Sequence, residues 1–358
     1  MRRFFDTIAS QQDANPVFEL DNRGKRAVVL DIRSDAGREA MKALVATADV
    51  FLTNVRPGGI ERSGLGYDIL SKRNPKLVYC ALTGYGLEGP DANAPGFDVA
   101  SFWSRSGLAR LTAPKGSELF PVRTASGDHT TSIAAVAAIN AALIQALKTG
   151  KGQLVDVSLL RTGLYTLHTD LAIQLFFGRI ASTRPRAEAY NPLTNFFRTK
   201  DDAWICIVAR AGKADLPRMA RAFDLPGIDT DPRFQDGNAR RDNAAAITAM
   251  FDEAFACFTK DEMAARLTAE EIAWAPAQTL ADVAVDPQVH AAGGIVQTPG
   301  KDGVGSFPSP AAPARFAGVD DGPKGPAPKL GEHTREVLAG LGYGEAEIVA
   351  MLESKAVA

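Results

Sequence analysis

Residues 126–158 read SGDHTTSIAAVAAINAALIQALKTGKGQLVDVS, and this stretch decides the fold class. A carboxylate, Asp128, stands just before a run of small and aliphatic residues at 132–147, which predicts a buried helix that packs closely through its alanines. The Thr-Gly-Lys-Gly-Gln sequence at 149–153 predicts a turn, and the β-branched residues at 154–159 predict a strand. Loop carboxylate, helix, turn and strand in this order are typical of an α/β fold.

The residues before this stretch alternate in the same way. Apolar β-rich runs predict strands, and segments with helical periodicity lie between them: strands at 27–32, 50–53 and 76–82, helices at 36–48 and 67–72. Such alternation favours right-handed crossovers and a mostly parallel sheet, which binds its ligands beyond the carboxyl ends of the strands. Residues 54–59 and 83–86 follow two of the predicted strands, so they are candidates for a ligand site.

The second half of the chain has a different pattern of predicted elements. Residues 195–208 predict a β-hairpin with an acidic turn, and helical patterns follow at 216–223, 244–258 and 260–267. Residues 293–328 are rich in Gly and Pro and predict a linker, after which helices are expected at 334–341 and 345–352. We therefore expect a large α/β domain at 1–188, a smaller α+β domain at 189–300, and a returning segment at 301–358.

Composition excludes several classes of function. The formal net charge of -2 gives no basic surface for nucleic acid, and the predicted helix at 132–147 is too short for a membrane span. Residues 1–5 resemble the start of a signal peptide, but Asp6 and the polar residues 11–13 interrupt any apolar region. Cys80, Cys206 and Cys257 lack metal or disulfide spacing and are expected to be reduced core residues. A cytoplasmic enzyme of small-molecule metabolism is the best expectation.

Other catalytic motifs fail on their context. Gly84-Tyr85-Gly86-Leu87-Glu88-Gly89 fits the dinucleotide fingerprint, but Pro90 and Pro95 follow where that fingerprint requires a helix. The four histidines show no metal-ligand spacing, and the Gly-x-Ser-x-Gly motif of serine hydrolases is absent. Asp128 itself stands where an aspartate is commonly a helix N-cap, a role that is compatible with catalysis by an ionised carboxylate.

A series of short blocks resembles the family III coenzyme A transferases, the CaiB/BaiF family, over nearly the whole chain. The blocks share the order found in that family: residues 22–26, 30–31, 48–50, 54–58, 83–86, 89–90, 95–98, 127–128, 231–234, 274–276 and 328–334. The resemblance implies an open, mostly parallel Rossmann-like sheet in a large domain, a smaller α+β domain and an interlocked homodimer. It also implies that Asp128 is the catalytic nucleophile.

The resemblance further implies where coenzyme A binds. The matching positions are Leu30, Asp31, Ile32, Arg33, Asn54, Val55, Arg56 and Arg62. Guanidinium groups beside glycine-rich strand ends can pair with phosphates, although each arginine can equally be an exposed solvated charge. Coenzyme A thioesters would be substrates, with no tightly bound cofactor and no metal. The implied reaction moves coenzyme A from an acyl thioester to a carboxylate through an aspartyl anhydride and an aspartyl thioester.

Two alternatives stay open. The racemase branch of this family has a histidine before the Asp of the 96–98 block as a second base, whereas this chain has Phe97, which cannot accept a proton. Phe97, Phe102 and Trp103 would form an apolar acyl pocket, or else belong to the core. The second alternative is a noncatalytic coenzyme-binding partner subunit. It is suggested by the resemblance itself, because relatives carry a few dozen residues before the 22–26 block, with the first strand and helix of the sheet, and we expect this chain to lack them.

Overall fold

The computed structural model describes residues 15–120, 122–123, 125–209, 212–300 and 305–358. The chain forms two compact units. Unit 1 comprises Met1–Arg110, Pro121–Arg179 and His290–Ala358, and unit 2 comprises Leu111–Phe120 and Ile180–Val289. Pro121 and Thr124, close to the predicted nucleophile, lie outside the described residues, as do the possible signal-peptide start at 1–5 and part of the predicted linker at 301–304.

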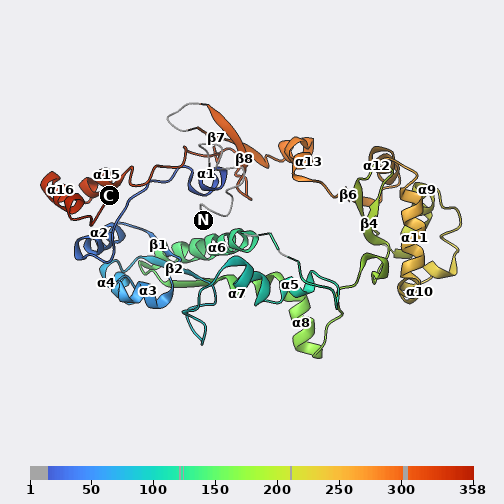
Figure 1. The fold of residues 1–358 in the computed structure, drawn as a ribbon, viewed down its shortest axis with the longest axis horizontal. Helices are drawn as coiled ribbons and strands as arrows, with labels where there is room; N and C mark the ends of the chain where they lie inside the picture. Colours follow the sequence, from blue (N-terminus) through green and yellow to red (C-terminus); the bar gives the residue numbers. More distant parts are fainter. Residues whose placement is uncertain (1–14, 121, 124, 210–211, 301–304) are drawn as a thin grey trace. The chain divides into compact units, whose positions relative to one another are not determined.

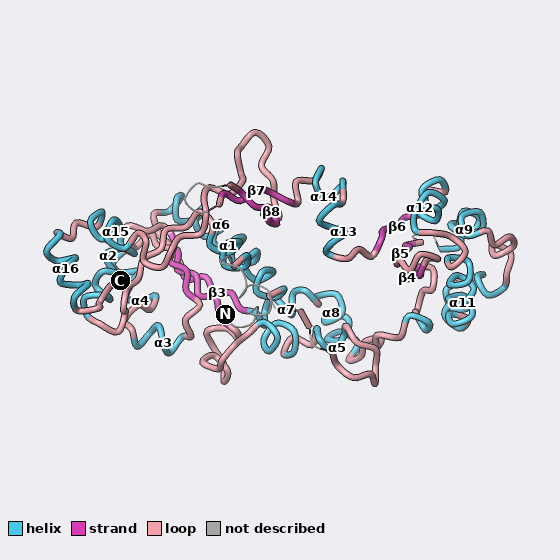
Figure 2. The backbone as a smooth tube through the Cα atoms, turned by 45° about the horizontal axis from the view of Figure 1, so that its top comes forward, coloured by secondary structure: helices cyan, strands magenta, loops and turns pink. Residues whose placement is uncertain are grey.

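A parallel sheet organises unit 1. Its strands are β1 (Val50–Thr53), β2 (Val78–Thr83) and β3 (Leu154–Ser158), in the order β1-β2-β3. In the register, Val50 lies opposite Val78 and Cys80 opposite Val155. Figure 2 shows these strands side by side. The predicted α/β class with a mostly parallel sheet is confirmed.

Helices cover both faces of this sheet. Tyr79 and Ala81 of β2 point to one face, where they join an apolar cluster with α2 (Asp35–Ala46), α3 (Pro57–Arg62) and α4 (Tyr67–Arg73). Val78 and Cys80 alternate with them and contact α6 (Ser126–Thr149) on the other face. This period of two along β2 gives unit 1 three layers, as a doubly covered parallel sheet requires.

The packing of α6 also fixes its direction. Val78, the first residue of β2, contacts Ala142 and Ala146 near the end of the helix, whereas Cys80 contacts Ala135, closer to its start. The helix therefore runs antiparallel to the strands, and its N-terminus with Asp128 lies toward their carboxyl ends. Figure 1 shows α6 along the sheet.

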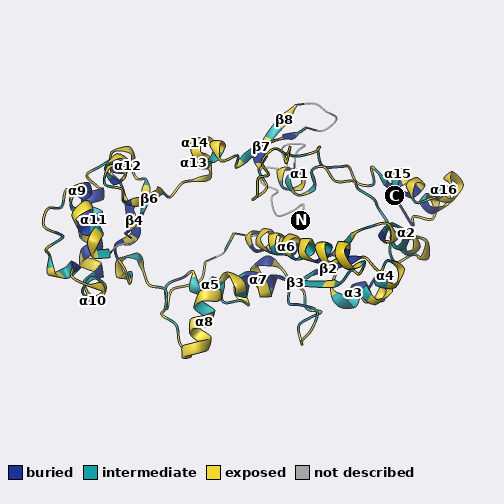
Figure 3. Cartoon of the chain, turned by 180° about the vertical axis from the view of Figure 1, so that it is seen from behind, coloured by how far each residue is buried: buried dark blue, intermediate teal, exposed yellow. Residues whose placement is uncertain are grey.

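The expectation that the helix is buried was wrong for most of its surface. Only five of its 24 residues are buried: Gly127, Thr131, Ala135, Ala142 and Ala146. The opposite side exposes Ile133, Val136, Ile144 and Leu147, and α6 is largely yellow in Figure 3. The helix is also longer than predicted. By length and composition alone, α6 is the one helix among the described residues that could cross a membrane.

The strand predicted at 27–32 is not part of the sheet. In this segment only Leu30 forms an isolated antiparallel bridge, with Val357, and the amide of Asp31 donates to the carbonyl of Ala356. Leu30 packs on the apolar cluster of α15 (Thr334–Gly340) and α16 (Glu345–Glu353). Residues 29–31 pair with the end of the chain rather than with the sheet, and Ile32 already lies in a turn.

The remaining elements of unit 1 include a hairpin that the sequence did not reveal. It consists of β7 (Ile295–Pro299) and β8 (Ser306–Pro310), within the predicted Gly- and Pro-rich linker. Arg23 donates to Ser309 Oγ at 2.7 Å and to Thr298 Oγ1 at 3.2 Å, which fixes the hairpin. The other elements in or at the borders of this unit are α1 (Pro16–Asn22), the π-helix η2 (Asp98–Ser104), α5 (Leu108–Leu111), α7 (Leu159–Thr166), α8 (His168–Phe177) and α14 (Pro287–Ala291).

Unit 2 is an α+β unit with its own core. The predicted hairpin forms from β4 (Thr194–Arg198) and β5 (Trp204–Val208), and β6 (Ala273–Pro276) adds an antiparallel third strand. Five buried phenylalanine rings lie in the core: Phe197, Phe223, Phe234, Phe251 and Phe255. The helices are η3 (Arg186–Glu188), η4 (Gly212–Asp215), α9 (Leu216–Phe223), η5 (Pro232–Phe234), α10 (Gly237–Asp242), α11 (Ala244–Phe255), α12 (Lys260–Ala269) and α13 (Leu280–Val285). Of the cysteines, Cys80 is buried as expected, but Cys257 is exposed.

Candidate active site

The three strands of the parallel sheet end in buried hydroxyl residues. Thr53 Oγ1 accepts from the amide of Val55 at 3.1 Å, and Thr83 Oγ1 accepts from Gly86 at 2.8 Å. Ser158 Oγ caps α7 by accepting from Arg161 at 3.2 Å. Each hydroxyl satisfies a backbone donor two or three residues after the end of its strand, where the chain leaves the sheet. This is the edge at which parallel sheets bind ligands.

Asp128 lies in the first turn of α6, directed to the same edge. The N-cap residue is Ala125, in the left-handed conformation with φ 70°, and no side chain in the described part of the chain caps the helix. Asp128 is therefore not the N-cap that the alternative interpretation of the sequence required. A non-glycine residue with positive φ is uncommon and is typical of positions under functional constraint.

The packing of Gly127 shows why the residue before Asp128 is a glycine. Its amide donates to Asp98 Oδ1 at 2.8 Å, and the Asp98 side chain and the Phe102 ring cover its α-carbon. A Cβ atom at this position would overlap both groups. Only glycine lets the start of α6 approach η2 so closely.

The π-helix η2 is itself placed by a second close approach. Gly84 follows β2, and a Cβ atom on it would lie 2.6 Å from the α-carbon of Gly96. Gly84, the first glycine of the false dinucleotide fingerprint, thus serves backbone packing. The approach brings residues 97–104 beside the start of α6, where Phe102 is buried while Phe97 is 72% exposed. Phe102 therefore belongs to the core, as one of the two interpretations held.

The electrostatic surroundings of Asp128 are mixed. The pKa of its carboxyl is raised, first by partial burial among protein atoms and then by the negative charge of Asp98. His129 opposes this shift, and Asp21 of α1, which lies 3.7 Å from His129 Nε2, adds to it. A carboxylate of raised basicity is a better nucleophile than an unperturbed one, provided that it is ionised.

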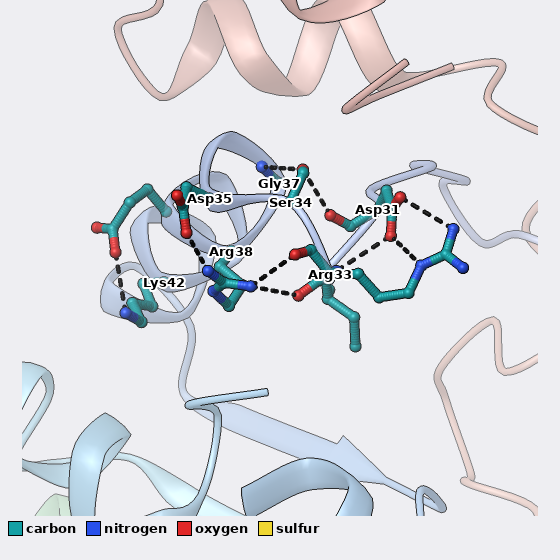
Figure 4. Close-up of polar contacts among 9 residues, drawn as sticks. Asp31, Arg33, Ser34, Asp35, Gly37, Arg38 and Lys42 are labelled. Atoms are coloured by element: carbon teal, nitrogen blue, oxygen red, sulfur yellow. Dashed lines mark hydrogen bonds and ion pairs between the residues drawn. The ribbon is translucent and has the colours of Figure 1, made fainter. Parts of the chain in front are cut away.

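The predicted coenzyme residues 30–33 form a tight loop before α2. Asp31 accepts from the backbone amide of Arg33 at 3.0 Å and from its guanidinium Nε at 2.8 Å, as Figure 4 shows. These hydrogen bonds from Arg33 lower the pKa of Asp31. Arg38 of α2 donates to the carbonyls of Ile32 and Arg33, and these hydrogen bonds fix the loop to the helix that follows it. The Arg33 side chain is 88% exposed, so its outer donors remain open to a ligand.

The second predicted coenzyme segment, Asn54, Val55 and Arg56, leaves β1 at the ligand edge. Arg56 Nη1 donates to the carbonyl of Asn93 at 3.3 Å, and Asn93 Oδ1 accepts from the amide of Gly58 at 2.7 Å. Arg62 closes α3 and is exposed. Ile32 packs on the apolar cluster that contains Ile60 of α3, the helix that follows residues 54–56. Their role in coenzyme binding stays a prediction.

Two contributors to the site could not be identified from the sequence. Asn93 orders the start of α3, and its only signal was an asparagine between two prolines. Asp98 was visible within the 95–98 block, but nothing in the sequence placed its carboxylate against Gly127. Among the described residues, no group of three or more His, Cys, Asp or Glu side chains is arranged to hold a metal ion.

Comparisons with known proteins identify the family of the chain. The model of CoA-transferase family III matches residues 1–334. The chain belongs to this family. It is 30% identical over 351 residues to (R)-2-hydroxy-4-methylpentanoate CoA-transferase of Clostridioides difficile, which covers 97% of this chain and 86% of that protein. It is also 30% identical over 323 residues to the beta subunit of succinyl-CoA–L-malate CoA-transferase of Chloroflexus aurantiacus, with 89% of this chain and 78% of that subunit covered.

A solved structure gives the same result for the fold. A CaiB/BaiF family protein from Brucella suis superposes with a TM-score of 0.79 and 31% sequence identity, covering 90% of this chain and 83% of that one. The resemblance inferred from the short blocks is thereby confirmed. The protein is an enzyme of the CoA-transferase class, and coenzyme A thioesters are the substrates of this class.

Proposed function

We propose that this enzyme transfers coenzyme A from an acyl thioester to a free carboxylic acid with Asp128 as covalent nucleophile. The observation that carries the proposal is the position of Asp128 in the first turn of α6, at the carboxyl edge of the sheet. The preceding residue, Gly127, is fixed by the hydrogen bond from its amide to Asp98. The predicted coenzyme loops at 30–33 and 54–56 belong to the same three-layer unit.

The reaction balances without an external energy source. A carboxylate oxygen of Asp128 attacks the donor thioester carbonyl, and the C–S bond breaks to give a mixed anhydride and coenzyme A thiolate. The thiolate attacks the aspartyl carbonyl, releases the donor acid as carboxylate, and leaves an aspartyl thioester. The acceptor carboxylate attacks that thioester and expels the thiolate, which then takes the acceptor acyl group and frees Asp128. Every step exchanges one activated carboxyl for another.

Trapping of the covalent intermediate tests the proposal. We expect hydroxylamine to form a hydroxamate at Asp128, seen by peptide mass spectrometry, after incubation with an accepted donor from a panel that includes succinyl-CoA. Asp128→Asn should lose transfer by about 10³-fold or more, because an amide cannot attack the thioester. Asp261→Asn, in the first turn of α12 in unit 2, is the matched control and should keep full activity. Undiminished transfer by Asp128→Asn would refute the mechanism.

We further propose that the working enzyme is a homodimer whose second copy covers the apolar faces of α6 and α8. The support is the amount of exposed apolar surface on these helices. On α8, Leu175, Phe176 and Phe177 are all more than half exposed, and on α6 the side chain of Leu147 is 85% exposed. Large exposed apolar surfaces mark interaction sites in soluble proteins. The family resemblance implies the same assembly, and we propose no tightly bound cofactor.

A further inference from the structure

A buried acid beside the nucleophile has no part in the reaction as written. Asp98 is only 5% exposed, and its Oδ1 accepts from the Gly127 amide. Its Oδ2 is buried and has no hydrogen-bond partner among the described residues, in which Asp98 also forms no ion pair. A buried carboxylate without a cationic partner is costly, because protein interior replaces the water that would solvate its charge. Such a cost is typical of a functional position.

Other buried polar groups on the same two elements also lack hydrogen-bond partners in the described part of the chain. These groups are Ser101 Oγ and Trp103 Nε1 on η2, and Thr131 Oγ1 on α6. They lie on the two elements that meet at Gly127. None of these groups is a cation, so none of them neutralises Asp98.

We propose that Asp98 is a positioning residue for Asp128, in two ways. Its Oδ1 fixes the first turn of α6 through the Gly127 amide, so the nucleophile is held in one orientation. Its negative charge makes the adjacent carboxylate more nucleophilic. The inference rests on the proposed function, because it assigns a role toward the same nucleophile.

The charge effect has a definite sign. A helix N-terminus stabilises an anion in the first turn and so weakens it as a nucleophile. Asp98 acts in the opposite direction, because a second negative charge destabilises the ionised form of Asp128. The other charged groups that face Asp128 are Asp21 from α1, which acts with Asp98, and His129 from α6 itself, which acts against it. Removal of the Asp98 charge should therefore lower the pKa of Asp128.

Asp98→Asn separates the two roles. The amide oxygen still accepts from Gly127, but the charge is gone. We expect the acid limb of kcat/KM, measured with succinyl-CoA or another accepted donor, to move to lower pH. We expect kcat to fall about tenfold with KM within about twofold, because a less basic carboxylate attacks more slowly. Asp98→Ala also loses the acceptor, so its kcat should fall further. Asp91→Asn, which removes an exposed charge paired with Arg105, is the control and should leave the pH profile unchanged.

A direct titration makes the test independent of substrate choice. In protein labelled with ¹³C at aspartate carboxyl carbons, the Asp128 signal is identified by its loss in Asp128→Asn. We expect this signal to titrate at lower pH in Asp98→Asn than in the parent protein. An unchanged titration and an unchanged acid limb in folded Asp98→Asn would overturn the inference, even if Asp98→Ala proved unstable. Transfer that persists in Asp128→Asn would refute the proposed function instead.

Discussion

At the scale of single residues, the glycine before the proposed nucleophile is closely packed on both sides. Because a Cβ atom on Gly127 would overlap Asp98 and Phe102, Gly127→Ala must push η2 and α6 apart. We expect a loss of about 1–3 kcal/mol in the free energy of unfolding, typical of overpacking, together with a large loss of kcat. Denaturant unfolding and steady-state kinetics measure both.

The matched substitution is Gly340→Ala at the end of α15, where a Cβ atom would meet nothing within 4 Å. We expect this variant to be as stable as the parent or more stable by up to about 1 kcal/mol, because alanine is the better helix former. If Gly127→Ala behaves like Gly340→Ala, the close packing of Asp98 on Gly127 is not a constraint.

Arg33 offers a second test at this scale. Among the described residues its guanidinium pairs with Asp31 alone, and the side chain is otherwise exposed, in one of the two predicted coenzyme loops. If its guanidinium binds a coenzyme phosphate, Arg33→Gln should weaken coenzyme A binding about tenfold and leave kcat within about twofold. Isothermal titration calorimetry with coenzyme A and kinetics with its thioesters measure the two quantities.

Arg73→Gln is the control for this experiment. Arg73 ends α4 just before β2 begins, so it lies toward the amino ends of the strands, opposite the proposed site. Its loss should leave the affinity for coenzyme A unchanged. Equal affinities in Arg33→Gln and the parent protein would remove Arg33 from the predicted coenzyme site.

At the scale of elements, local patterns predicted what local physics controls. The strand at 50–53 and the helix at 216–223 have the bounds expected from their periodicity. The segment at 27–32 has an equally apolar pattern, yet it pairs with residues near 357 at the far end of the chain. A period of two shows that a segment is extended, but it does not name the partner. The hairpin at 295–310 was hidden because prolines at 299, 308 and 310 argue against strands, although they are tolerated in a two-stranded hairpin.

The site shows the same division between local and long-range information. Asp128 could be found because the Gly-Asp pair, the helix and the turn after it are contiguous in sequence. Asp98 accepts a hydrogen bond from the amide of Gly127, 29 residues later in the sequence. This contact depends on the close approach of Gly84 to Gly96. Only the folded backbone brings these positions together. A buried acid with one open oxygen could therefore be recognised in the structure and not before.

At the scale of the whole molecule, substitutions on the exposed apolar faces of α6 and α8 can test whether the protein is a dimer. Phe176 is 83% exposed in the single chain, so Phe176→Ser removes no contact from its core. If a second copy covers this face, the variant should fold normally but raise the dimer dissociation constant by about tenfold or more. Sedimentation equilibrium over a range of concentrations measures the dissociation constant, with thermal unfolding at a concentration where both proteins are monomeric as the folding control.

Leu280→Ser, which removes an equally exposed leucine from α13, should leave the dimer unchanged. A parent protein that stays monomeric and instead sediments with lipid vesicles would show that the apolar face of α6 serves a membrane rather than a second copy.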